Sequence, residues 1–191
     1  MDEPGAFANH RGDEVEVVPR PIQRPHPPLW LGGGVHAESC QLAVNNALPL
    51  MLPSLFRYPE DYLPVVEHYR AEMAAAGHAA RTRLAMPSYC WVSKTSQEAR
   101  RTWRPRLDRY VRYAGSLRES YGRPTDFEGL LQGPAICGSP AEVVDRIGAL
   151  NHSMGLDHHI LLMDVGGVPF DELRAALELM GSQVLPHFNA P

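Results

Sequence analysis

The chain of 191 residues is long enough for one domain with a buried core, and its 44% apolar and 21% charged residues are typical of a folded protein. A formal net charge of −4 provides no basic surface for nucleic acid or an anionic membrane, and no apolar run approaches the roughly 20 residues that cross a bilayer. Residues 1–5 lack the features of a signal peptide, and three cysteines in no CxxC spacing favour reduced thiols over disulfides or a zinc site. These features predict a soluble, cytoplasmic protein.

The first 28 residues are expected to form an extended arm. Residues 1–14 are polar and show no periodicity, as in a loop. The prolines of residues 19–28 remove backbone donors and bias their neighbours towards extended geometry, which excludes a helix or a central strand. The apolar side chain of Ile22 favours an arm docked on a surface over a disordered linker.

From Leu29 onward the pattern alternates between strand and helix. Short apolar runs predict strands over residues 29–31, 48–52, 84–92 and 160–163, the last with both faces apolar. Helices are predicted to begin near residues 38, 59, 95, 139 and 169. Residues 122–133 are rich in turn residues and are interpreted as a loop long enough for a lid or an insertion. Four strand–helix units in a row predict a parallel α/β fold.

Helix signals also predict which side chains face the core and where helices begin and end. Ser139, Pro140 and Glu142 form a capping box with proline in the first turn. Gly77 and Gly155 fit the positions just after helix ends. Helical spacing predicts inward side chains at Leu42, Ala43, Tyr62, Val66, Tyr69, Met73, Trp103, Leu107, Tyr110, Ala114, Leu117, Val143, Ile147, Leu150, Met154, Leu173, Leu177, Met180 and Val184.

Three consecutive glycines, Gly32 to Gly34, follow the first strand and precede a helix start. A strand, a glycine loop and a helix N-terminus together present free N–H groups and a positive dipole end to an anion. One hypothesis is therefore a phosphate-bearing cofactor held by residues 32–39. The alternative is a tight turn in which the glycines only relieve crowding.

Other polar residues give weaker signals. Gly138 and Ser139 precede a helix and suggest a second anion site, but the capping box explains Ser139 without a ligand. His158 and His159 precede the fourth predicted strand and are interpreted as structural or solvated. Neither a nucleophile–base pair nor a metal-ligand spacing occurs, so no catalytic residue and no metal site are predicted.

Four stretches of the chain resemble the bacterial luciferase-like flavin-dependent monooxygenases. Residues 17–30 are similar to the segment that leads into the family's fifth strand, and residues 43–49 to its next helix-to-strand step, with Ala47 where the family has glycine. Residues 136–143 resemble the family's Gly-Ser-Pro-Glu-Glu-Val helix start. Residues 155–169 and 184–188 match its last strand and closing segment, so that order and spacing agree over nearly the whole chain.

The resemblance implies a (β/α)8 TIM-type barrel of which this chain holds strands five to eight, the C-terminal half. Residues 1–28 then belong to the family's central insertion, and residues 29–191 form a half-barrel of four βα units. A whole barrel needs about 250 residues. A half-barrel leaves two unpaired sheet edges and an apolar inner face. We therefore expect a homo-oligomer, association with a missing N-terminal half, or a fragment of a longer or interrupted reading frame.

The resemblance also implies a function and a cofactor. It indicates a monooxygenase that oxidises an organic substrate with O2 and reduced FMN, or F420 as the alternative, with a flavin reductase as the source of electrons. The alternative is a non-catalytic flavin-binding or interaction remnant, because family members supply polar groups near the flavin from strands that this chain lacks. Trp30, Trp91 and Trp103 are interpreted as core residues rather than flavin stackers.

The family's flavin-phosphate loop places the cofactor at Gly32, Gly33, Gly34, Val35, His36 and Ser39. Val35 to Ala37 stand where the family often has hydroxyl residues, so backbone N–H groups and His36 are expected to replace them. The mouth of the barrel implies a lower-ranked substrate or flavin site at Asp164, Gly166 and Gly167.

Overall fold

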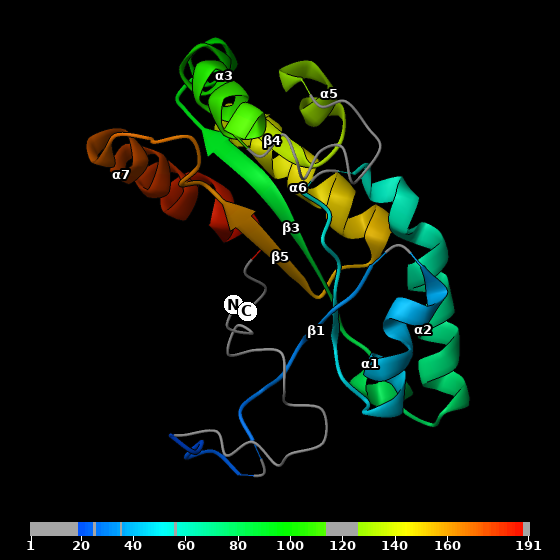
Figure 1. The fold of residues 1–191 in the computed structure, drawn as a ribbon. Helices are drawn as coiled ribbons and strands as arrows, with labels where there is room; N and C mark the ends of the chain where they lie inside the picture. Colours follow the sequence, from blue (N-terminus) through cyan, green and yellow to red (C-terminus); the bar gives the residue numbers. More distant parts are fainter. Residues whose placement is uncertain (1–18, 25, 35, 56, 114–125, 189–191) are drawn as a thin grey trace, which may run out of the picture.

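The computed structural model describes residues 19–24, 26–34, 36–55, 57–113 and 126–188. One parallel sheet lies at its centre, with helices packed around it (Figure 1). The strands are β1 (Leu31–Gly32), β2 (Leu50–Met51), β3 (Leu84–Val92), β4 (Ala135–Gly138) and β5 (His158–Leu162). The α-helices are α1 (Gln41–Asn45), α2 (Leu63–Ala75), α3 (Ser96–Tyr113), α5 (Phe127–Gln132), α6 (Pro140–Met154) and α7 (Phe170–Leu179). Shorter helical turns are η1 (Ala37–Cys40), η2 (Pro59–Tyr62), η3 (Ala79–Arg81), η4 (Met180–Val184) and η5 (Leu185–His187).

Strand β3 is the central strand and is bonded along both edges. The backbone N–H and C=O groups of odd-numbered residues in β3 and at its two ends point to one edge. On this edge Leu50 N–H donates to the Arg83 carbonyl, and Ser93 N–H donates to the Gly138 carbonyl. The backbone groups of the even-numbered residues point to the other edge, where Asp157 N–H donates to the Leu84 carbonyl. Strands β2 and β4 therefore follow one another along one edge of β3, and β5 occupies the opposite edge.

Pro87 lies in the middle of β3, although proline is normally excluded from central strands because it cannot donate to a ladder. Pairing with β2 ends at Ala85 and pairing with β4 begins at Tyr89, so Pro87 falls in the gap between them. Its carbonyl accepts a hydrogen bond of 2.7 Å from the buried Ser54 hydroxyl. Proline has no N–H, and in this gap none is needed for pairing with β2 or β4. All nine residues of β3 can therefore be buried.

The four predicted strands are all present and parallel, and a fifth, β4, was not expected. Its four residues come immediately before the capping box of α6, so they resembled the approach to a helix. The capping box is confirmed, with Ser139 and Glu142 bonded reciprocally, and Gly155 ends α6 in the left-handed conformation at φ 61°. The predicted apolar stripes of α2 and α6 are buried.

Four predictions made from local patterns are wrong. The interpretation of residues 122–133 as a loop fails for the described part, because helix α5 occupies Phe127–Gln132, capped by the Asp126 side chain. Residues 114–125, which include the predicted inward positions 114 and 117, lie outside the described residues. Leu42 is 57% exposed because the chain turns through η1 before α1, which buries other positions. Leu177 is 51% exposed because α7 buries Ala176 instead, whereas Met180 and Val184 are buried as predicted. Ile22 is 94% exposed, against the expected docking of the arm.

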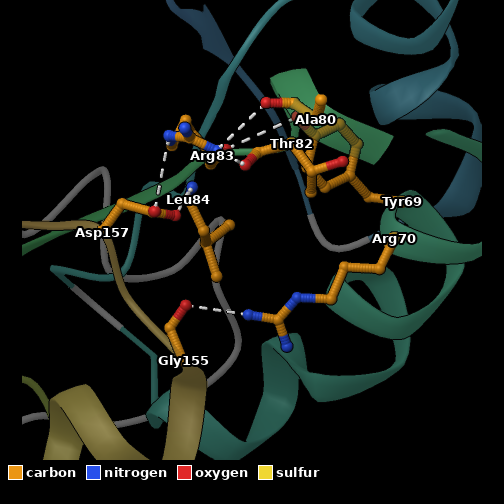
Figure 2. Close-up of polar contacts among 8 residues, drawn as sticks. All are labelled: Tyr69, Arg70, Ala80, Thr82, Arg83, Leu84, Gly155 and Asp157. Carbon is orange, nitrogen blue, oxygen red and sulfur yellow. Dashed lines mark hydrogen bonds and ion pairs between the residues drawn. The ribbon is translucent and has the colours of Figure 1, made fainter. Parts of the chain in front are cut away.

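Side-chain contacts fix the turn from α6 into β5 (Figure 2). The Asp157 carboxylate accepts a 2.8 Å hydrogen bond from Leu84 N–H and lies 3.6 Å from Nε of Arg83. Arg70 of α2 donates to the carbonyls of Met154 and Gly155 at 3.0 and 2.8 Å, which are carbonyls at the end of α6. Cations at a helix C-terminus are favourable because they oppose the helix dipole. The start of β5 is thus held in register with the start of β3.

The face of the sheet opposite Leu50 and Leu84 is exposed at β5, whereas the residues of β3 on that face are buried. Leu31, Leu50 and Leu84 share a face by register, and Leu50 and Leu84 are buried under the helices. On the opposite face β5 presents His158 and Ile160, both exposed, Ile160 by 43%. Among the described residues neither β1 nor β5 has a strand on its outer edge. No helix of the described part is long and apolar enough to span a membrane.

His158 and His159 lie within β5, whereas the sequence placed them before the strand. The ring Nδ1 of His159 is 2.8 Å from Oδ1 of Asn151, and its Nε2 is 2.8 Å from the Ser88 hydroxyl. A neutral ring protonated on Nδ1 satisfies both contacts. Burial lowers the pKa of His159 from 6.5 to about 4. His159 thus has a structural role, as one of the two interpretations proposed.

Replacing His159 with Gln is predicted to make the free energy of unfolding depend less on pH between about pH 4 and 6.5. Because burial lowers its pKa in the folded state, the unfolded chain binds a proton first. The stability from the neutral ring is complete above about pH 6.5 and falls as the pH drops towards 4, by at most about 1.4 kcal/mol per pH unit. Urea unfolding from pH 4 to 8 should show a smaller slope for His159→Gln. His152→Gln, at an exposed position on α6, is the control, and parallel profiles for wild type and His159→Gln would contradict the account.

Candidate functional site

The loop after β1 is held tightly against β2. Gly33 N–H donates to the Met51 carbonyl at 2.9 Å. A Cβ atom on Gly33 would lie 2.7 Å from Cδ1 of the buried Leu50, so only glycine fits without a shift of that side chain. The alternative interpretation, a tight turn in which glycine relieves crowding, therefore accounts for Gly33. Gly32 is exposed and would meet no atom within 4 Å, so crowding does not account for it.

The hydroxyl of Ser39 is used inside the loop. It accepts a hydrogen bond of 2.8 Å from Gly34 N–H and donates one of 2.6 Å to the His36 carbonyl. Ser39 N–H donates to the same carbonyl at 3.0 Å. In this arrangement Ser39 shapes the turn and its hydroxyl proton does not point to a ligand.

Two backbone donors of η1 remain. His36 is extended at φ −101° and ψ 144° and caps η1 with no side-chain hydrogen bond. The N–H groups of Ala37 and Glu38 belong to the first turn, where a helix has no internal acceptor for them, and no acceptor is found for them in the described part of the chain. His36, Ala37 and Glu38 are exposed. Two N–H groups and an imidazole fit the phosphate of a flavin nucleotide, while the Glu38 carboxylate opposes it. Val35 lies outside the described residues.

The two glycines after β5 have different surroundings. Both are left-handed, Gly166 at φ 74° and Gly167 at φ 72°. A Cβ on Gly166 would lie 2.2 Å from the Arg106 carbonyl oxygen of α3, whereas one on Gly167 would meet nothing within 4 Å. Gly166 is therefore required for the contact with α3. Asp164 is exposed and makes no side-chain hydrogen bond or ion pair with the residues that the structure describes, and its polar role near a ligand stays a prediction.

A pocket of about 700 Å³ lies between α3 and α7, where β3 ends, and the sequence analysis did not find it. Trp91, Val92 and Ser93 line it from β3, and Gly167 lines it from the loop after β5, whereas Asp164 does not. One signal in the sequence could have indicated the α3 side: Glu98, Arg101, Thr102, Pro105, Arg106 and Arg109 recur at helical spacing and so share one face.

The bidentate ion pair between Arg106 and Glu172 connects α3 to α7 across this region. Nη1 and Nη2 of Arg106 lie 2.7 and 2.8 Å from the two carboxylate oxygens of Glu172. The Arg106 side chain is only 18% exposed, so this pair is better shielded than an ordinary surface pair. It holds the two walls of the pocket together.

The cysteines lack the environment of reactive thiols. Burial raises the pKa of Cys40 and Cys90, and it raises the pKa of Cys137 to about 12. A thiolate is the reactive form, so these groups are inert at neutral pH. Within the described residues no group of His, Cys, Asp and Glu side chains could hold a metal ion.

A family model described as luciferase-like monooxygenase matches residues 4–158. The chain belongs to the luciferase-like monooxygenase family. No curated protein matches the chain closely enough to count as a relative.

Solved structures of similar fold cover most of this chain and about half of their own. The monooxygenase RslO1 from Streptomyces bottropensis is 24% identical over 90% of this chain and 51% of its own, with a TM-score of 0.77. The oxygenating constituent of 3,6-diketocamphane monooxygenase from Pseudomonas putida, in complex with FMN, is 20% identical over 87% and 50%, with a TM-score of 0.66. The F420-dependent tetrahydromethanopterin reductase of Methanopyrus kandleri is 19% identical over 85% and 51%, with a TM-score of 0.59.

This likeness confirms the fold class: the chain is a parallel α/β half-barrel of the luciferase-like type, spanning about half the length of these family structures. The phosphate-loop residues Gly32, Gly33, Gly34, Val35, His36 and Ser39 stay a prediction, as do Asp164, Gly166 and Gly167 at the mouth. Trp91 and Trp103 are buried, as their interpretation as core residues requires, and Trp30 is half-buried with its ring 5.1 Å from that of His158.

Alanine at Gly166 is predicted to cost more stability than alanine at Gly167. Both substitutions force a side chain into left-handed backbone, which costs about 1–2 kcal/mol. Only Gly166→Ala also drives a methyl group into the backbone of α3. Urea unfolding should give a loss of about 1 kcal/mol for Gly167→Ala and at least about twice that for Gly166→Ala. Equal losses would show that the close approach to α3 is not a real constraint.

Proposed function

We propose that this chain is the C-terminal half of a luciferase-like flavin-dependent oxidoreductase. The complete enzyme oxidises an organic substrate with O2 and a reduced flavin, FMN or F420, supplied by a flavin reductase in the cytoplasm. The observation that carries the cofactor part is the pair of N–H groups of Ala37 and Glu38 at the turn after β1, for which the described residues provide no acceptor. A solved structure of similar fold in complex with FMN and another of an F420-dependent enzyme support a flavin-type cofactor.

The residues of this chain would contribute binding rather than bond-making. Ala37 and Glu38 would donate their N–H groups to the phosphate, and the exposed imidazole of His36 adds a further donor. Gly33 keeps the loop close to β2, and Ser39 holds its curvature through Gly34 and His36. When bound, a flavin supplies the redox chemistry, and the protein supplies orientation and shielding from water.

The exposed β5 side of the sheet supports a second part of the proposal, namely that a partner completes the site. In the described part of the chain no strand pairs with the outer edge of β1 or of β5, and unpaired edges of this kind pair readily with another strand. Ile160 adds an exposed apolar side chain on the same face. The partner is a second copy of this chain or a polypeptide that carries the other half of the barrel.

Flavin fluorescence titration with FMN and riboflavin tests the phosphate loop. FMN and riboflavin differ only by the phosphate, so the wild type should bind FMN more tightly. Ala37→Pro removes one N–H, and proline is tolerated there because it falls at the first position of the turn and His36 is already extended. This variant should weaken FMN binding by about tenfold and leave riboflavin binding unchanged.

The matched variant Glu38→Gln keeps the backbone donor and removes the opposing charge. It should tighten FMN binding by several fold, again with no change for riboflavin. Equal affinity of wild type for FMN and riboflavin would overturn the phosphate loop. Binding of FMN without oxidation of any substrate, even with the other half-barrel supplied, would favour the non-catalytic remnant instead.

A further inference from the structure

The pocket between α3 and α7 has the size of a small-molecule site and belongs to different elements from the phosphate loop. Its volume of about 700 Å³ falls within the range of ligand pockets. Its base is formed where β3 ends, by Trp91, Val92 and Ser93, all buried. In TIM-type barrels ligands bind at this carboxyl-terminal end of the strands.

The α3 side of the pocket carries an excess of positive charge. Four cationic side chains line the pocket, of which Arg106 is neutralised by Glu172. Lys94, Arg101 and Arg109 remain, against the single carboxylate of Glu98. All three cations are exposed, and in the described part of the chain none of them makes an ion pair. A concave surface with one sign of charge concentrates ligands of the opposite sign.

The α7 side is apolar. Ala175, Ala176 and Leu179 line it, and the Trp91 ring, 2% exposed, lies at its base. The pocket therefore has a cationic wall and an apolar wall that face each other. That arrangement suits a ligand with an anionic head and an apolar body, because each part then meets its own complement.

The two walls are held at a fixed separation before any ligand arrives. The Arg106–Glu172 pair joins them on one side, and the backbone of α3 contacts Gly166 directly on the other. A preformed pocket loses less conformational entropy on binding.

We propose that this pocket binds a small organic anion, with its head group at Arg101 and Arg109 and its apolar body against Ala175 and Leu179. The guanidinium groups bind the head group by charge-assisted hydrogen bonds. The proposal does not rest on flavin binding, because it uses neither η1 nor the glycine loop.

Calorimetric titration of the flavin-free chain tests the proposal with 1-naphthaleneacetate as the anionic probe and 1-naphthaleneacetamide as its uncharged counterpart. The anion should bind at least about tenfold more tightly than the amide. The double substitution Arg101→Gln and Arg109→Gln should remove that difference. Arg112→Gln, an exposed arginine of the same helix that does not line the pocket, should change the affinity by less than about twofold.

Ala175→Phe provides a second variant, which fills the apolar wall from an exposed position of α7 and leaves every charge in place. It should abolish binding of both probes, while circular dichroism shows an unchanged fold. Equal binding of acid and amide, equal losses in the Arg112→Gln and double variants, or undiminished binding in Ala175→Phe would each overturn the proposal. The FMN titrations of Ala37→Pro and Glu38→Gln are unaffected by any of these results, so the two proposals fail separately.

Discussion

Strand β3 is bonded along both edges and buried over its whole length, and every other element takes its position from it. Strands β2 and β4 share one edge and β5 fills the other, with Pro87 in the one gap where a missing N–H does no harm. Asp157 and Arg70 fix the register at one end of this strand. At its other end the chain opens into the pocket between α3 and α7. A central strand of this kind tolerates little change, because any shift would be transmitted to both edges.

The parts of the fold that were predictable from sequence are those determined by near neighbours in the chain. The capping box at Ser139, the glycine end of α6 and the stripe of α2 depend on residues within a few turns. Strand β4 and helix α5 were missed because four or six residues carry too little periodicity. Leu42 and Leu177 were assigned to the core wrongly, since η1 and the packing of α7 changed which positions face inward. The pocket was missed because Arg106 and Glu172 are 66 residues apart and meet only in the folded chain.

Some residues of the predicted phosphate loop, residues 32–39, are explained by packing, and others are available for binding. Gly33 is occupied by its contacts with β2 and Ser39 by contacts inside the loop, whereas the N–H groups of Ala37 and Glu38 have no acceptor among the described residues. A sequence motif alone cannot make that division, because it depends on how close Leu50 lies to Gly33. The loop lies at the end of β1, beside an edge that no strand of the described residues covers. Occupancy of the loop and completion of the sheet are therefore linked in this account.

The central claim is that the chain is half of a barrel whose exposed β5 side needs a partner. Size-exclusion chromatography with light scattering on the purified chain tests it most directly. The account predicts a mass of twice the chain or more, and a shift towards the single-chain mass when Ile160→Glu places a charge on the exposed face of β5. A stable, non-aggregating monomer of the unaltered chain across micromolar concentrations would contradict it.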